Sequence, residues 1–255
     1  MSATSAFQAS ESESRLVDPS EIARFNALAA EWWNPNGPMK PLHRINPVRL
    51  SYLKDEFAKH FARDSRAMRP FEGLRLLDIG CGAGLVAEPM AKQGFAVTAI
   101  DLAEENIAAA KLHAEQSGVK VDYRAAAVET LPLDAPFDAI SLLEVVEHVP
   151  DVGEFIAEAA RRLKPGGLLI ASTLNRTLKA YALAIVGAEY VLRWVPRGTH
   201  DWQKFVTPNE LEGHLEAASL TPVARQGLVF NPLGNAWHLS SDCDVNYFVV
   251  ARKAG

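Results

Sequence analysis

The sequence is poor in cysteine and in positive charge. Its two cysteines, Cys81 and Cys243, are too few for a disulfide framework and suit a reducing compartment. The 26 Lys and Arg residues are outnumbered by 31 Asp and Glu, which gives a net charge of -5. Because a protein that binds duplex nucleic acid usually carries a basic face, nucleic acid is not expected as a partner.

Long apolar runs are also missing. No stretch approaches the roughly 18 to 20 uncharged apolar residues of a membrane-spanning helix. The opening residues MSATSAFQASESES have neither a basic start nor an apolar run, so we expect no secretory signal and predict a disordered tail over 1–16. We expect residues 17–255 to form a single domain of a cytoplasmic protein, long enough for a sizeable core.

What the chain does have is an alternation of strand and helix patterns from Leu74 onward. This alternation predicts an α/β fold, with a seven-stranded, mostly parallel sheet covered by helices on both faces. Two helices are expected before the sheet, the second from about Val48 to His60. A helical insertion over about 175–205, with a long helix near 177–195, is expected to form a lid. The seven expected strands are LRLLDI, FAVTAID, VKVDYRA, FDAISLLE, GGLLIAST and two near 222–230 and 246–252.

A glycine loop follows the first of these strands. In LLDIGCGAGLVAEPM, the residues Gly80, Gly82 and Gly84 lie between a buried strand and a helix. Ligands of parallel open sheets bind beyond the carboxyl ends of the strands, and glycines let the backbone approach them closely. A plain tight turn is the alternative. Dinucleotide sites use G-x-G-x-x-G, whereas here Leu85 occupies the position of the third glycine.

Two acids accompany the loop. Asp78 ends the strand before it, where a carboxylate would repel a pyrophosphate but would suit a cation such as the sulfonium and ammonium groups of S-adenosylmethionine. Asp101 ends the next strand, about twenty residues on, where a carboxylate accepts hydrogen bonds from ribose hydroxyls. Asp101 is equally placed to cap the following helix, and the two roles are compatible.

In this region the sequence resembles the class I S-adenosylmethionine-dependent methyltransferases. The resemblance implies the Rossmann-like fold of that class and a site for S-adenosylmethionine, with Leu143 at the end of the fourth strand lining its adenosine or methionine part. Related methyltransferases often have an acid after the third strand that binds the adenine amino group. Here Ala126-Ala127-Val128 stand at that point, which leaves the adenine contact to the backbone. The cofactor contacts implied are Asp78, Gly80, Gly82, Gly84, Asp101 and Leu143.

An acidic cluster, Glu144-Val145-Val146-Glu147-His148, follows the fourth strand, where the methyl acceptor should approach. If the segment is helical, Glu144, Glu147 and His148 share a face. These residues either support the structure of the site or activate the acceptor. Activation would use His148 as a general base, a bound cation, or both, and His148 and Glu144 are the candidate catalytic residues. Two carboxylates suit Mg²⁺, whereas the histidine favours a transition metal.

Stretches outside the cofactor region are similar to the O-methyltransferases of ubiquinone biosynthesis, from about Val17 to Val250. This resemblance implies O-methylation of a polyprenylated catechol and of demethylubiquinol. It implies that Arg49 reaches the methionine carboxylate, whereas the residues alone would make Arg49 a solvated helix charge. It also places a divalent metal at Glu144, Glu147 and His148. The stretches are WWNPNGPMKPLHRINPVRL, LHAEQSGVKVDY, STLNRTLKAY, VGAEYVLRWVPRGTHDWQKF and DVNYFV.

A polyprenyl substrate resides in a bilayer, and residues 178–195 have the composition to meet one. Apolar residues recur there at helical spacing, and Lys179, Arg193 and Arg197 are placed to meet anionic headgroups. A core-packing helix or a lid is the alternative. We expect peripheral association with the inner membrane, and a complex of ubiquinone-biosynthesis proteins is a further candidate partner. The segment NPLGNAWHLSSDCD is expected to wall the pocket of the aromatic head, with His200 and Asp201 as weaker candidates.

Two other functions stay open at this point. One is an O-methyltransferase that acts on a soluble phenol. The other is a non-catalytic lipid-binding protein of the same fold. The intact glycine loop, Asp101 and the run from Glu144 to His148 argue against the second.

Overall fold

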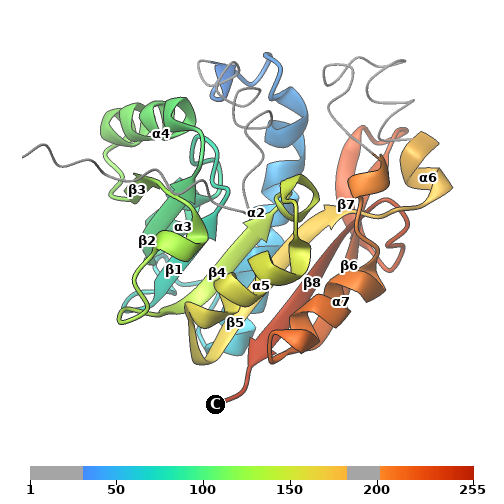
Figure 1. The fold of residues 1–255 in the computed structure, drawn as a ribbon. Coiled ribbons are helices and arrows are strands. Elements are labelled where there is room, and N and C mark those ends of the chain that lie inside the picture. The colour runs from blue at the N-terminus through green and yellow to red at the C-terminus, as the bar shows by residue number, and fades with distance from the viewer. Residues whose placement is uncertain (1–30, 183–201) are drawn as a thin grey trace, which may run out of the picture.

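The computed structural model describes residues 31–182 and 202–255 of the chain. Its described part contains one sheet of eight strands in the order β3-β2-β1-β4-β5-β8-β6-β7 (Figure 1). The predicted tail, the first predicted helix up to residue 30 and most of the predicted 177–195 helix lie outside the described residues. The strands are β1 Arg75–Ile79, β2 Ala96–Asp101, β3 Asp122–Ala125, β4 Phe137–Leu143, β5 Leu163–Leu174, β6 Leu220–Asn231, β7 Ala236–Ser240 and β8 Asn246–Lys253.

The first five strands run parallel to one another, and β8, β6 and β7 complete the sheet through antiparallel pairings, the first of them between β5 and β8. The predicted α/β class and mostly parallel sheet are therefore confirmed. The helices are α2 Lys40–His60, α3 Ala87–Lys92, α4 Glu104–Ser117, α5 Val152–Arg161, α6 Leu178–Ala180 and α7 Pro208–Ala217, with 3₁₀ turns at η2 Val128–Thr130, η3 Val146–His148 and η5 Trp202–Lys204.

Helices cover both faces of the sheet, as predicted (Figure 1). Neighbouring residues of one strand point to opposite faces, so Leu76 belongs to one hydrophobic cluster and Leu77 to the other. The first cluster takes its helical residues from α2, α3 and α4, and the second takes them from α5 and α7. The sheet is therefore buried on both sides, which suits its apolar parallel strands.

The eighth strand, β7, was not predicted. It arises from the segment expected to be a wall of the acceptor pocket, and it pairs antiparallel with β6, Phe230 opposite Trp237. The connecting turn is closed by the Asn231 side chain, whose Oδ1 accepts from the backbone N–H groups of Leu233 and Gly234. Five residues are too short a run to give a clear alternation of apolar and polar positions.

Helix α2 begins at Lys40, well before the expected Val48, and it contains Pro47. A proline inside a helix removes one backbone hydrogen bond and usually ends the helix. Here the first turns bury Ile45, which is 6% exposed, against the core, and this packing outweighs the loss at Pro47. The longer helix matters because it carries Arg49 in its interior.

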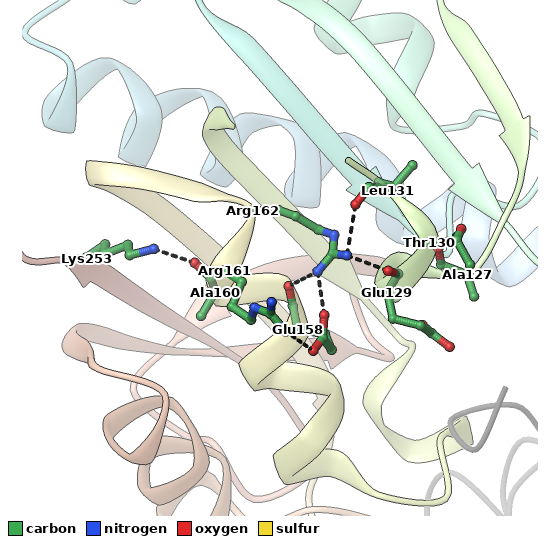
Figure 2. Close-up of polar contacts among 9 residues, drawn as sticks. All are labelled: Ala127, Glu129, Thr130, Leu131, Glu158, Ala160, Arg161, Arg162 and Lys253. Carbon is green, nitrogen blue, oxygen red and sulfur yellow. Dashed lines mark hydrogen bonds and ion pairs between the residues drawn. The ribbon is translucent and has the colours of Figure 1, made fainter. Parts of the chain in front are cut away.

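A buried arginine joins α5 to the segment that follows β3 (Figure 2). Arg162 is 2% exposed and donates to Glu158 Oε2 and to the backbone oxygens of Glu129 and Leu131, at 2.6, 2.7 and 2.9 Å. These bonds hold η2 against α5. They fix the backbone after β3, the stretch expected to face the adenine ring.

Among the helices that the structure describes, we find none with the length and hydropathy needed to cross a bilayer.

Candidate cofactor and acceptor site

The glycine loop lies between β1 and α3, at the carboxyl edge of the parallel strands. Gly80, Gly82 and Gly84 have φ angles of +69°, +52° and +90°, which residues other than glycine rarely adopt. A Cβ atom at these positions would collide with Val145, with Trp32 and with Tyr123 respectively. The glycines are therefore required by the backbone path, in line with the tight turn that the sequence left open, and also by the protein's own side chains, which the sequence did not indicate.

Asp101, at the end of β2, binds the loop and the start of α4. Its Oδ2 accepts from the backbone N–H of Gly82 at 2.8 Å, and its Oδ1 accepts from that of Ala103 at 2.9 Å and from Asn106 Nδ2 at 3.4 Å. Burial raises the pKa of Asp101, and these hydrogen bonds oppose the rise. The predicted side-chain cap on the following helix is not formed, because Ala103 is the N-cap residue of α4 and Asp101 binds its N–H from outside the helix. The carboxylate lies at the edge where a ribose is expected.

Asp78, at the end region of β1, is a buried carboxylate with one oxygen unused. The residue is 3% exposed, and Ser141 Oγ donates to its Oδ1 at 2.6 Å. Its Oδ2 has no hydrogen-bond partner within the described part of the chain. Burial, together with the charge of Asp101, raises the pKa of Asp78 to about 7. A cation at this edge would satisfy the free oxygen and restore the charged form.

Arg49 of α2 is buried, 5% exposed, so it is not the solvated helix charge that the residues alone suggest. Its Nη2 donates to Glu144 Oε1 at 2.6 Å, and Ser172 and Asn246 donate to the same oxygen at 2.9 and 3.0 Å. Burial would raise the pKa of Glu144, but the Arg49 charge and these bonds lower it. Arg49 Nε is buried with no partner among the described residues, so one donor is left for an anion.

The acidic cluster does not form the α-helix considered above. Glu144 has a φ of +56°, and η3 follows it as a single 3₁₀ turn. Glu147 is buried, and Thr173 Oγ1 donates to its Oε2 at 2.8 Å. Burial and the charge of Glu144 raise the pKa of Glu147 to about 7, and nearby His148 opposes the rise. His148, the last residue of η3, is half-buried.

The metal hypothesis gains no support from this geometry. Across residues 31–182 and 202–255, no three acidic, histidine or cysteine side chains are grouped so as to hold a metal ion. The oxygen Oε1 of Glu144 already accepts three hydrogen bonds within the protein. A divalent cation at Glu144, Glu147 and His148 therefore stays a prediction.

The structure brings the predicted cofactor residues to one edge of the sheet. The end of β1 lies between the ends of β2 and β4, with Ile79 paired to Ile100 and to Leu142. The candidate residues lie at the ends of these three strands or directly after them: Asp78, the three glycines, Asp101, Leu143 and the acidic cluster. Arg49 of α2 joins them through its bond to Glu144. His200 and Asp201 lie outside the described residues.

Sequence reasoning gave no role to Trp32, Asn106 and Asn246, which all contact this edge. A signal existed for Asn106, because a polar residue stands on the buried face of α4 beside Ile107 and Ala110. At the surface, Lys179 donates to Asp242 at 2.5 Å and to Asp244 at 3.2 Å, and its predicted contact with headgroups stays a prediction.

Comparisons with known proteins agree with this arrangement. A family model described as a methyltransferase domain matches residues 77–171. The ubiquinone biosynthesis O-methyltransferase of Paramagnetospirillum magneticum is 55% identical over 237 residues, 93% of this chain and 95% of that protein. Its counterpart in Mesorhizobium japonicum is 57% identical over 239 residues, 93% of this chain and 96% of that protein.

A solved structure shares the fold at low identity. Magnesium protoporphyrin IX methyltransferase from Synechocystis, with bound SAH, superposes with a TM-score of 0.64 at 17% identity, covering 93% of this chain and 100% of that one. At this identity the likeness concerns the fold alone.

Proposed function

The chain belongs to the family of ubiquinone biosynthesis O-methyltransferases, and we propose that it transfers a methyl group from S-adenosylmethionine to oxygen atoms of a polyprenylated catechol and of demethylubiquinol. The observation that carries this proposal is identity above one half along nearly the full length of both chains. The site geometry adds support, because its free polar atoms suit the two ends of the methionine group.

The residues fit S-adenosylmethionine in three respects. The unused Asp78 Oδ2 is an acceptor for a cationic group, and the unused Arg49 Nε is a donor for a carboxylate. The Asp101 carboxylate stands where ribose hydroxyls are bound in such folds. When bound, the cofactor supplies an electrophilic methyl group on a sulfonium. The protein's part is to hold the acceptor oxygen in line with that group, which accounts for much of the acceleration.

The acceptor phenol must lose its proton. A phenol has a pKa of about 10, so near pH 7 only about one molecule in a thousand is ionised. We assign the role of accepting this proton to His148, which is half-buried after β4 and lies beside the buried Glu147. Glu144 is a poor general base because Arg49 lowers its pKa. Its role is instead to hold Arg49 in place.

The membrane is the proposed source of the polyprenylated substrate. The start of the 178–195 segment exposes two apolar side chains, Leu178 at 80% and Tyr181 at 45%. These side chains support peripheral docking of the enzyme on an anionic inner-membrane surface through this segment. An assembly with other proteins of ubiquinone biosynthesis would bring the site to the same substrates.

A mass-spectrometric assay tests the proposal. The enzyme with S-adenosylmethionine should add 14 mass units, one methylene equivalent by the chemistry of methylation, to a prenylated catechol, and a catechol without the tail should react more slowly. His148→Ala should depress turnover about 10²- to 10⁴-fold while the affinity for S-adenosylhomocysteine stays near that of the wild type. Parallel reactions with EDTA and with added Mg²⁺ test the predicted cation. Failure to methylate any prenylated catechol or quinol would refute the proposed activity.

A further inference from the structure

Trp32 covers the glycine loop, and the mechanism above gives it no part. Trp32 is 8% exposed and packs in one hydrophobic cluster with Ala83 and Leu85 of the loop before α3. A Cβ added to Gly82 would lie 2.5 Å from Cη2 of its ring. The indole therefore lies directly on the backbone of Gly82, the residue whose N–H donates to Asp101 Oδ2.

Trp32 also reaches Asp101 through an amide. Its indole Nε1–H donates to Asn106 Oδ1 at 2.8 Å, and Asn106 is 1% exposed. An indole N–H can only donate, so it fixes the Asn106 carbonyl toward Trp32 and the amide NH₂ away from it. The Nδ2 atom then donates to Asp101 Oδ1, at 3.4 Å. Without the indole N–H, this bond no longer selects between the two orientations of the amide. In the flipped orientation the Asn106 carbonyl would face the Asp101 carboxylate and repel it.

The polar groups that hold the Asp101 carboxylate include the N–H groups of Gly82 and Ala103 and the amide of Asn106. Trp32 contacts two of them, Gly82 by packing and Asn106 by a hydrogen bond. These bonds favour the charged carboxylate against the effect of burial. Trp32 thus influences both the direction in which Asp101 points and the charge it carries.

We propose that Trp32 is a positioning residue of the cofactor site, which acts through Asn106 and Gly82 to orient the Asp101 carboxylate toward the ribose hydroxyls of S-adenosylmethionine. This inference rests on the proposed function, because it takes the bound nucleoside from there. It assigns a role to a residue 74 positions away from Asn106 in the chain.

Calorimetric titration with two ligands tests it. The wild type should bind S-adenosylhomocysteine at least about 10- to 100-fold more tightly than S-(2′,3′-dideoxyadenosyl)homocysteine, the deoxy ligand that lacks both ribose hydroxyls, because each hydroxyl can donate to a charged group. Trp32→Phe keeps most of the ring but removes the N–H. It should weaken binding of S-adenosylhomocysteine about 5- to 20-fold and leave the deoxy ligand within about 2-fold, so the ratio of the two affinities collapses.

Two comparisons separate positioning from packing. Trp202→Phe removes a similar bond, from Nε1 to Thr177 O at 3.1 Å, away from the loop, and should leave the ratio unchanged. In an Asn106→Ala background the ratio should already be low, and Trp32→Phe should lower it no further; this variant also serves if Trp32→Phe does not fold. Equal weakening of both ligands by Trp32→Phe, or no weakening of either, would overturn the inference. A wild type that binds neither ligand would overturn the proposed function as well.

Discussion

At the scale of the single residue, the buried Asp78 lowers the stability of the ligand-free fold at neutral pH. Its carboxylate is buried, and burial raises its pKa from 3.8 to about 7. The folded chain therefore keeps a proton that the unfolded chain loses above about pH 4, so stability falls as the pH rises toward 7 and is level above it. A cationic ligand beside the free Oδ2 would recover this loss on binding.

Asp78→Asn should remove that dependence. The free energy of unfolding of the ligand-free variant should exceed that of the wild type by on the order of 2 kcal/mol at pH 8 and by less at pH 5. Its affinity for S-adenosylmethionine should fall, because the amide offers no charge to the cation. Urea unfolding at both pH values and calorimetry measure these effects.

Asp122→Asn is the matched control, because Asp122 is exposed and pairs with Arg124 at the surface. It should change neither quantity by more than about 1 kcal/mol. A wild type whose stability does not change between pH 5 and 8 relative to Asp78→Asn would show that Asp78 is charged in the folded chain, contrary to the argument.

Single residues also show which parts of the site the sequence could predict and which it could not. The placement of Asp78 and Asp101 was predictable because each lies at the end of a strand in an alternating pattern, and position in such a pattern fixes the edge of the sheet. The environment of Arg49 was not, because its partner Glu144 is 95 residues away and only the folded chain brings them together. A local sequence pattern carries no information on such a pairing.

At the scale of the element, the glycine loop depends on two separate requirements, a positive φ and space. Gly82→Ala violates both, since its Cβ would meet Trp32. Gly118, after α4, has a φ of +66° but open space around an added Cβ. Gly118→Ala should therefore cost about 1 kcal/mol, from the backbone alone.

Gly82→Ala should cost about 1 to 3 kcal/mol more than Gly118→Ala, because the indole must move to make room. It should also weaken S-adenosylhomocysteine binding, whereas Gly118→Ala should not. Denaturant unfolding of both variants beside the wild type measures the difference. Equal costs for the two would mean that Trp32 yields freely and that the loop is not held by it.

The elements differ in how well the sequence predicted them. Helix α4 and helix α7 lie close to their predicted ranges, because their apolar residues recur at helical spacing. The start of α2 was missed because Pro47 is a local signal for a boundary, and tertiary packing of Ile45 overrides it. The strand β7 was missed because its stability comes from pairing with β6, which no pattern within five residues reveals.

At the scale of the whole molecule, the fold and the edge of the sheet that carries the candidate site could be predicted from the order of elements, whereas the proposed docking surface for a membrane could not. The described start of the 178–195 segment exposes Leu178 and Tyr181, and Lys179 pairs with Asp242 and Asp244 at the surface. Contact of this segment with lipid stays a prediction.

Flotation with vesicles of phosphatidylethanolamine and phosphatidylglycerol tests the docking. The double variant Leu178→Asp, Tyr181→Asp should remain with the soluble fraction, because two acids at the interface oppose both burial and attraction to anionic lipid. Leu112→Asp changes a leucine on α4 that is 58% exposed and should float like the wild type. If the double variant floats as well as the wild type, the membrane is met by another surface.

The central claim is that the edge formed by the glycine loop, Asp78 and Asp101 binds S-adenosylmethionine. Its most direct test is calorimetric titration of the wild type and Asp101→Asn with S-adenosylmethionine and, separately, with NAD. We predict one S-adenosylmethionine site per chain, affinity at least about 10-fold weaker in Asp101→Asn, and no binding of NAD. Equal affinity in the two proteins, or binding of NAD alone, would contradict the claim.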